Sequence, residues 1–459
     1  MKKVKLLNIL VFIFFISLTS CFTDDLDPTL EQEKSVEGSI VDVDNLYGIL
    51  KGAYSRMTAS GYYGRDIIIT NEVRTDNCFS NGNSGRFTTQ ASFTYSANTG
   101  YFWDEAYATI ASANIIIGTD VSNLTGDQDY GKHMQGQAYA IRALAHFDLL
   151  KQYGQQHAGG TLGVPYVTEF KGEDLFPARN TVSEVKTMIM NDLNTAFDLM
   201  SDDYYDSSKE FMSKYTAKAL ESRVAIYFGD WSIAKTSAES VINSGHYSIV
   251  SSSDFVGSWG QDGSSNSIFE LAYNSTDNQG INGLAYIYRT TGGGSYGDVQ
   301  VIDEVANEFE AGDVRGVGGI LGWEGTMLRN IGKYPDNQGY DNVPVIRYEE
   351  VILNYAEALF EIDNLDPNAL TQLNLIPNNR GASAYAAATK DNILNERRKE
   401  LMFEGFRYDD LLRTGNDIVK YSLQQNFTST ISYGDYRLTW AIPQAEVDAN
   451  SNMVQNEGY

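Results

Sequence analysis

Apolar side chains recur at helical spacing along much of the chain. In residues 137–153 and again in residues 185–200, apolar positions return every third or fourth residue. Such a repeat places the apolar side chains on one face of an α-helix. Thr181 or Ser183 can cap the start of the second helix. Both segments are therefore predicted to be helices that bury one face.

Residues 216–245 predict two helices joined by a turn at Gly229 and Asp230. Small and large apolar residues alternate in this segment, and small side chains let neighbouring helices approach closely. The pattern resembles a tetratricopeptide-type helix pair, although other helical hairpins share it. The predicted fold class is mostly α, with tetratricopeptide-like helix pairs packed with a loop-rich, irregular region. Further helices are expected in residues 44–57, 102–120, 347–362 and 391–403.

The chain changes character between residues 245 and 342, where Gly, Ser, Asn and aromatic residues prevail. Residues 74–95 have a similar composition. Long loops in a compact domain usually carry function, because a rigid scaffold holds them on the surface. Both segments are candidate binding loops, and the alternative is that they only cover the helices.

The start of the chain has the pattern of an export signal. Three lysines, Lys2, Lys3 and Lys5, precede an almost wholly apolar run over residues 6–18. This run is too short to cross a bilayer, which needs about 20 apolar residues. A basic start followed by a short apolar core is typical of a secretory signal peptide, here residues 1–20. A short buried helix is the alternative.

Residues 18–21 (Leu-Thr-Ser-Cys) resemble the lipobox of bacterial lipoproteins. The resemblance implies cleavage before Cys21 and attachment of acyl chains such as palmitate there, and several chains hold far better than one. The acidic residues that follow resemble a surface-export signal of Bacteroidetes lipoproteins, and they equally suit a solvated tether. We expect an acidic flexible tether in residues 21–36 and a single domain in residues 37–459.

Charge and composition narrow the choice of ligand. The formal net charge is -26. This charge excludes a nucleic-acid partner, because Lys and Arg drive such binding by displacing counterions. Neutral or weakly charged ligands remain open. The 30 tyrosines stand out, and each offers a flat apolar face and a hydroxyl that suit sugars and peptides alike. Most of them are nevertheless expected to pack between helices.

Signatures of catalysis and of metal binding are missing from the sequence. The four histidines form no zinc spacing, and neither a GxSxG elbow nor a phosphate-binding glycine loop with its lysine occurs. Since Cys21 is assigned to the lipid, Cys78 has no partner for a disulfide within the chain. The sequence therefore predicts no catalytic residue, no metal ligand and no cofactor.

Three segments near the end of the chain, together with the lipobox, resemble the SusD/RagB family. They are residues 347–359 (RYEEVILNYAEAL), residues 378–413 from NNRG to FRYDDLLR, and residues 441–459. The resemblance implies a SusD-like α-α fold without enzymatic activity, on the cell surface at the outer membrane. It also implies a TonB-dependent transporter of the SusC type as partner. Over that transporter such a protein holds an oligosaccharide or, in some members, an oligopeptide.

One helix carries carboxylates that could suggest catalysis. Glu396, Glu400 and Glu404 lie four residues apart and so share one helix face. A glycosidase instead needs two carboxylates about 5–10 Å apart across a cleft, on either side of the scissile bond. We interpret the three as part of a structural ion-pair network that orients the helix. The expected partners are Arg397, Arg398, Arg407 and Arg413.

We expect capture without bond cleavage, by stacking and side-chain hydrogen bonds in a shallow site. By position, the binding loops of the family match the loop after Glu72 and residues 284–296. The first loop lacks the Trp that starch-binding members carry there, which argues against starch. The candidate stacking residues are Phe79, Phe87, Tyr286, Tyr288, Tyr296, Trp259 and Trp323. The candidate polar contacts are Asp76, Asn81, Arg86 and Arg289.

Three other functions stay open beside glycan capture. An oligopeptide ligand would find main-chain partners in the Asn- and Gly-rich loops. A surface glycoside hydrolase would lose its activity when Glu396, Glu400 or Glu404 is replaced. A scaffold lipoprotein would use tetratricopeptide grooves for protein partners, and its binding would survive deletion of residues 284–296.

Overall fold

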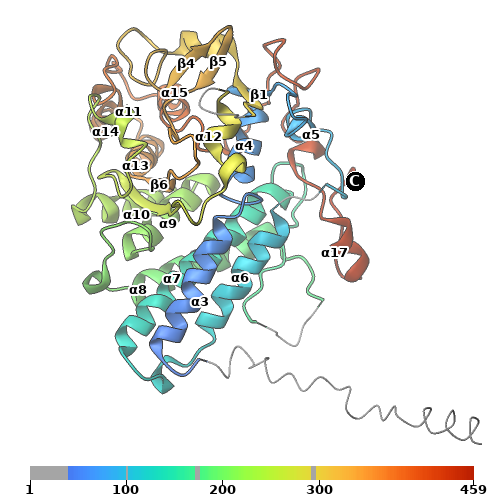
Figure 1. The fold of residues 1–459 in the computed structure, drawn as a ribbon, viewed down its shortest axis with the longest axis vertical. Coiled ribbons are helices and arrows are strands. Elements are labelled where there is room, and N and C mark those ends of the chain that lie inside the picture. The colour runs from blue at the N-terminus through green and yellow to red at the C-terminus, as the bar shows by residue number, and fades with distance from the viewer. Residues whose placement is uncertain (1–39, 100–101, 171–175, 291–295) are drawn as a thin grey trace, which may run out of the picture. The chain divides into compact units, whose positions relative to one another are not determined.

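The computed structural model describes residues 40–99, 102–170, 176–290 and 296–459 (Figure 1). The predicted signal peptide, Cys21 and the tether lie outside these residues. The fold is mostly helical, with 47% helix and few strands, which confirms the predicted fold class. Within the described ranges, none of the helices combines the length and the apolar character that crossing a membrane requires.

Four long helices lie side by side (Figure 1). They are α3 (Val43–Met57), α6 (Trp103–Ile117), α7 (Gln128–Tyr153) and α8 (Val182–Leu199). α8 begins with a capping box, in which the Glu184 backbone N–H donates to the Thr181 hydroxyl and the Thr181 N–H donates to the Glu184 carboxylate. α7 begins before its predicted range, because its first turns are polar and carry no apolar repeat.

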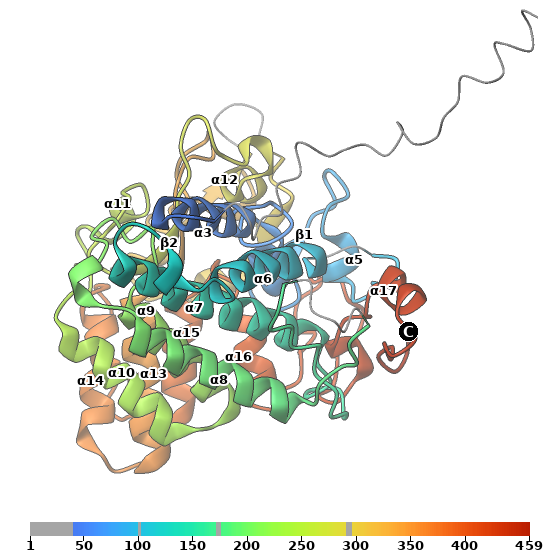
Figure 2. The same cartoon turned by 90° about the horizontal axis from the view of Figure 1, so that it is seen from below.

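The predicted helix pair forms α9 (Lys214–Phe228) and α10 (Trp231–Ser244). Gly229 ends α9 with φ +76°, a left-handed conformation that glycine adopts at little cost. The chain therefore reverses within two residues, and α10 packs back on α9. Figure 2 shows α9 and α10 gathered with the C-terminal helices α13 and α14 at one side of the molecule.

Four helices follow in the C-terminal part of the chain, and the first three share one apolar core. They are α13 (Tyr348–Ile362), α14 (Pro367–Asn378), α15 (Lys390–Glu400) and α16 (Arg407–Arg413). The sequence pattern missed α14, although Asp366 caps its start and Pro367 occupies its first position, where proline is favoured. The core residues that join α13, α14 and α15 are Ile352, Leu353, Ala356, Leu373, Ile376 and Ile393.

In the part of the chain that the structure describes, six short strands form three antiparallel pairs, β1 with β3, β2 with β6 and β4 with β5. The strands are β1 (Cys78–Ser80), β2 (Ser267–Leu271), β3 (Val299–Val301), β4 (Leu321–Glu324), β5 (Met327–Asn330) and β6 (Val343–Arg347). β1 belongs to the first predicted binding loop and β3 to the loop-rich region. Their pairing, with Phe79 opposite Gln300, therefore joins the two regions that the sequence singled out.

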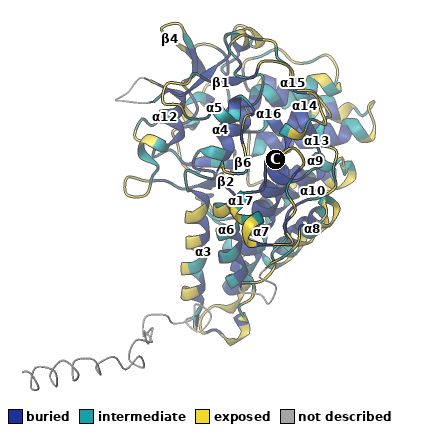
Figure 3. Cartoon of the chain, turned by 90° about the vertical axis from the view of Figure 1, so that its right-hand side faces the viewer, coloured by how far each residue is buried: buried dark blue, intermediate teal, exposed yellow. Residues whose placement is uncertain are grey.

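Short helices complete the chain between these elements. The α-helical ones are α4 (Asp66–Val73), α5 (Thr88–Ala91), α11 (Phe255–Ser258), α12 (Leu284–Tyr288) and α17 (Gln444–Ala449). The segments of 3-10 helix are Val121–Asn123, Asp202–Tyr204, Gly280–Asn282, Asp303–Glu308 and Tyr436–Leu438. Figure 3 shows that the strands and helices are largely buried, and that α3 carries exposed residues along one side.

Candidate functional site

The strand β1 is held on both sides and sets the position of the loop that follows it. On one side the Asn81 N–H donates to the Asp298 carbonyl at 2.9 Å, next to β3. On the other side the Asn426 side chain takes the place of a strand. Its Oδ1 accepts from Ser80 N at 2.9 Å and its Nδ2 donates to Ser80 O at 2.8 Å. The loop thus leaves a fixed strand.

The loop after β1 is bound to the chain around residue 297. Asn81 Nδ2 donates to the Gly297 carbonyl at 2.7 Å, and Asn83 Nδ2 donates to the Tyr296 carbonyl at 2.6 Å. The Ser84 N–H donates to Asp298 Oδ1 at 2.9 Å. Side-chain amides therefore replace the strand ladder where the two segments separate, and they hold the loop against Tyr296.

An arginine and a tyrosine face each other across this junction. The guanidinium carbon of Arg86 lies 4.4 Å from the ring centroid of Tyr296, within the range of a cation–π contact. Both side chains are half-buried. Sequence spacing could not indicate this pair, because it depends on the pairing of β1 with β3.

The β4–β5 hairpin extends the same surface. Its Trp323 is 46% exposed, which is unusual for a residue of this size. The neighbouring Glu324 pairs with Arg329 at 2.9 Å, and Arg329 Nη1 donates to the Gly297 carbonyl at 3.0 Å. The hairpin is thereby tied to the residue that follows Tyr296. We call Asn81, Asn83, Arg86, Tyr296 and Trp323 the candidate surface.

Several predicted aromatic contacts are buried and packed within the protein. Tyr288 is 1% exposed, stacks on Tyr334 and meets the edge of Phe403. Trp259 packs against Phe255 and Tyr334, and Lys333 and Arg347 lie over its ring. Phe79 and Phe87 are buried as well. Internal packing accounts for all four side chains, and we leave them out of the candidate surface.

Two predicted polar contacts are likewise engaged inside the protein. Arg289 donates to the carbonyls of Ile331 and Tyr334, which fixes the turn after β5. Asp76 forms a two-bond pair with Arg407, at 2.7 and 2.6 Å. Burial opposes the charged form of Asp76, but the arginine outweighs it and holds the pKa of the carboxyl at about 2. Tyr286 is half-buried, and its carbonyl accepts from the Gly297 N–H.

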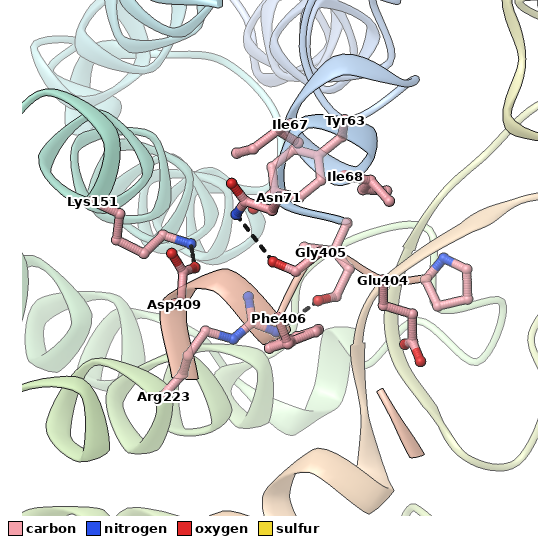
Figure 4. Close-up of a pocket in the computed structure, with 12 residues that line it drawn as sticks. Tyr63, Ile67, Ile68, Asn71, Lys151, Arg223, Glu404, Gly405, Phe406 and Asp409 are labelled. Carbon is pink, nitrogen blue, oxygen red and sulfur yellow. Dashed lines mark hydrogen bonds and ion pairs between the residues drawn. The ribbon is translucent and has the colours of Figure 1, made fainter. Parts of the chain in front are cut away.

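Three cavities of the described fold are too small for an oligomer. Figure 4 shows one of them between α4, α7, α9 and α16, where Lys151 pairs with Asp409 at 2.9 Å and Asn71 donates to the Gly405 carbonyl. Its volume is about 30 Å³, and two others measure about 20 and 10 Å³. Each holds only one or two water molecules. None of these three cavities could take a ligand of several sugar or peptide units.

Glu396, Glu400 and Glu404 take part in a buried ion-pair network, as interpreted from the sequence. Glu400 pairs with Arg380 at 2.9 Å and with Arg347 at 3.0 Å, Glu404 pairs with Arg347, and Glu396 pairs with Arg315. These partners come from distant segments, and the arginines expected from the sequence pair elsewhere, Arg397 with Asp410 and Arg413 with Glu357.

The electrostatics of this network favour charged carboxylates. Burial opposes ionisation of Glu400, but Arg380 and Arg347 outweigh it and hold the pKa of the carboxyl far below its ordinary value. The pKa of Glu404 is lowered as well, by Arg347 and Lys333 against the effect of burial. A general acid needs a raised pKa, so these carboxyls are suited to a structural role. Among the described residues, no cluster of three histidine, cysteine or acidic side chains could hold a metal ion.

The sequence is similar to those of known protein families. A family model described as starch-binding and associating with the outer membrane matches residues 28–226, and a model described as the SusD family matches residues 323–459. A SusD-like protein of Formosa agariphila is 24% identical over the whole of both chains. The starch-binding protein SusD of Bacteroides thetaiotaomicron is 30% identical over 28% of this chain and 22% of its own.

Solved structures resemble the whole fold. A SusD superfamily protein of Bacteroides vulgatus is 28% identical, with a TM-score of 0.81 over 91% of this chain and 99% of that one. Another from Bacteroides thetaiotaomicron is 25% identical, with a TM-score of 0.82 over 91% of this chain and 100% of that one.

Proposed function

Because the chain belongs to the SusD/RagB family, we propose that it captures an oligosaccharide at the cell surface and delivers it to a SusC-like TonB-dependent transporter in the outer membrane. The observation that carries the proposal is the candidate surface. It combines an exposed indole, a tyrosine ring, side-chain amides and a guanidinium on two segments that are fixed to each other. Sugars present CH faces and hydroxyl edges, which such groups recognise by stacking and hydrogen bonding.

Binding without catalysis is part of this proposal. The three glutamates that could suggest hydrolysis are engaged with arginines, and Glu400 and Glu404 have lowered pKa values. Glu396 and Glu400 lie one turn apart on α15, but Glu404 follows the end of that helix, so the shared helix face expected from the sequence does not extend to Glu404. A glycosidase instead places its two carboxyls on either side of the bond. A hydrolase therefore stays an alternative only if replacing Glu396, Glu400 or Glu404 abolishes an activity of the folded protein.

An oligopeptide is the second candidate ligand, because some members of the family are expected to take peptides. A peptide needs partners for its backbone amides and carbonyls. The amides of Asn81 and Asn83 already donate to the carbonyls of Gly297 and Tyr296. These bonds are the same whichever ligand binds, so a direct comparison of glycan and peptide binding has to decide between the two ligand classes.

The experiment is titration calorimetry on the soluble form that begins after Cys21, with plant, host and microbial glycans and with a tryptic peptide mixture. Binding to a glycan that is lost in Trp323→Ala and Tyr296→Ala would support capture at the candidate surface. Binding to peptides alone would favour the second ligand class. Binding that survives both substitutions and a deletion of residues 284–296 would favour the scaffold alternative.

The lipid anchor at Cys21 is part of the proposal, and mass spectrometry of the protein purified from membranes tests it. The mature N-terminal peptide should carry acyl chains on Cys21. The variant Cys21→Ser should leave the membrane fraction and should retain its ligand affinity. Recovery of Cys21→Ser in the membrane fraction would contradict the anchor.

Contact with the transporter can be tested beside the candidate surface. Tyr421 is 44% and Leu423 is 99% exposed, on a segment that Asn426 ties to β1. A partner that receives the ligand from this side would cover them, so Leu423→Asp should reduce co-purification of the co-expressed transporter. Leu365→Asp, at a position that is 84% exposed in the turn before α14, is the matched control. Equal yields of transporter from both variants would place the contact elsewhere.

A further inference from the structure

The guanidinium of Arg86 has no partner of its own. Every other arginine in the described ranges donates a side-chain hydrogen bond to a carboxylate, an amide, a hydroxyl or a carbonyl. Arg86 is the exception among the described residues, and its Nη1 is enclosed without a hydrogen-bond acceptor. A guanidinium removed from water without an acceptor costs free energy. Its contact in this structure is the ring of Tyr296.

The surroundings of Arg86 are depleted of acidic residues. Acidic residues outnumber basic ones by 60 to 34 in the chain, yet in residues 77–103 Arg86 is the one charged side chain. Two acidic residues lie near the candidate surface. Asp298 is fully buried and accepts from the Ser84 N–H, and Glu324 accepts from Thr290 and pairs with Arg329. Among the described residues, Arg86 therefore forms no ion pair that would neutralise its charge.

From these observations we propose that the captured oligosaccharide is acidic, and that Arg86 binds its carboxylate or sulfate group. A guanidinium is planar and forms two parallel hydrogen bonds with a carboxylate or a sulfate. Tyr296 supports the guanidinium from beneath, and Trp323 offers a ring face to the sugar. The inference rests on the proposed function and adds the charge class of the ligand.

The net charge of the chain limits this class further. At -26, the protein repels a dense polyanion. At physiological salt, however, charges more than about 8–10 Å apart are largely screened. A single acidic group can thus reach Arg86, whose neighbours in residues 77–103 include no acid. A ligand with one charge on every unit would instead be repelled by the many acidic residues of the chain. We infer an oligosaccharide with spaced uronic acids or sulfate esters.

Matched glycan pairs test the inference by calorimetry. One pair is an oligogalacturonide of low charge density, obtained by partial methyl esterification, and its fully esterified neutral form. The other is a sulfated galactan oligosaccharide and its desulfated form. The two pairs separate a carboxylate from a sulfate. In the wild-type protein we expect at least one acidic member to bind about tenfold or more tightly than its neutral counterpart, the effect of a charge-assisted hydrogen bond.

The decisive variants are Arg86→Gln and Arg86→Lys. Arg86→Gln should weaken binding of the acidic glycan about tenfold to a hundredfold and binding of the neutral glycan by a much smaller factor, while Arg86→Lys should fall between. Arg437→Gln removes a comparably exposed guanidinium that pairs with Asp435, and it should change neither affinity. The neutral glycan shows that each variant has kept its fold and its stacking surface.

Two results would overturn the inference and leave the proposed function intact. One is equal affinity of the wild-type protein for the acidic and neutral members of both pairs. The other is an acidic glycan that binds Arg86→Gln as tightly as wild type. Arg86-dependent binding of an acidic peptide, with no glycan bound, would transfer the charge contact to the second ligand class. Failure of all glycans and peptides to bind would instead overturn the proposed function, and the inference with it.

Discussion

Arginine has different surroundings in two regions of this molecule. Between α13 and α15, Arg315, Arg347 and Arg380 bind Glu349, Glu396, Glu400 and Glu404, and all seven side chains are buried. We call these residues the ion-pair core. On the candidate surface, Arg86 lies over a tyrosine ring and forms no ion pair with any described residue. The same side chain therefore fixes the framework where its charge is neutralised, and it is available to a ligand where its charge is not.

A substitution in the ion-pair core should cause the largest loss of unfolding free energy. Arg380→Met leaves Glu349 and Glu400 buried with one partner fewer, and breaking a buried pair costs about 3–5 kcal/mol of unfolding free energy. Urea denaturation measures this loss. Where the variant is still folded, its ligand affinity should equal that of wild type, because the core holds the surface and does not contact the ligand. If Arg380→Met were as stable as wild type, the ion-pair core would not be what fixes the framework.

Acid should weaken the framework before it affects the surface. Burial disfavours the charged form of Glu357, but Arg413 outweighs it and holds the pKa at about 2. A carboxyl with a lowered pKa stabilises the fold above its ordinary pKa of about 4.5, and this contribution disappears as the pH falls toward 2. We expect the unfolding free energy to fall by up to about 3 kcal/mol between pH 4.5 and pH 2. Glu357→Gln should be less stable at pH 7 and should show a smaller loss, as denaturation at several pH values will measure.

A substitution on the candidate surface should change the Kd for the ligand and not the stability of the fold. Trp323→Ala removes an indole that a sugar would cover, and burial of a large apolar side chain contributes about 1.5–3 kcal/mol, or about tenfold to a hundredfold in Kd. Thermal unfolding should be nearly unchanged, because the side chain is exposed. Tyr433→Ala, at a tyrosine that is 42% exposed and contacts His157, is the control. An equal loss of affinity in the control would remove Trp323 from the site.

Removal of an exposed ion pair should have the smallest effect on the unfolding free energy. Lys132 pairs with Asp129 on α7 at 2.9 Å, and both side chains are exposed. Lys132→Ala should change the unfolding free energy by about 0.5 kcal/mol or less, because solvent screens the pair. It should leave the Kd for the ligand unchanged. A loss comparable to that of Arg380→Met would show that burial does not separate the two kinds of pair.

The sequence predicted the long helices because each has a local apolar repeat or a local cap, as Thr181 and Gly229 illustrate. It missed α14, which starts at Pro367 and contains Pro377 in its last turn. The three glutamates were correctly assigned to an ion-pair network, but none of the arginines expected as their partners pairs with them, since Arg315 and Arg347 come from distant segments.

The side chains of the candidate surface were harder to predict than the helices. The sequence located the two loops, and their pairing through β1 and β3 joins them. Which aromatic side chain is exposed depends on contacts that composition does not reveal. Tyr288 and Tyr296 lie in one predicted loop, yet the first packs against Tyr334 and Phe403 while the second lies beside Arg86. Asn83 was missed, although the Asn-Gly-Asn-Ser-Gly sequence around it marks a turn.

The side chain of Asn426 has a consequence for solubility. A short strand with one unpaired edge offers its N–H and C=O groups to any extended segment of another molecule, and such pairing starts aggregation. In β1 that edge is Ser80, and the Asn426 amide satisfies both of its backbone groups. The side chain of Asn426 thus occupies backbone groups of β1 with which an extended segment of a neighbouring molecule could otherwise pair.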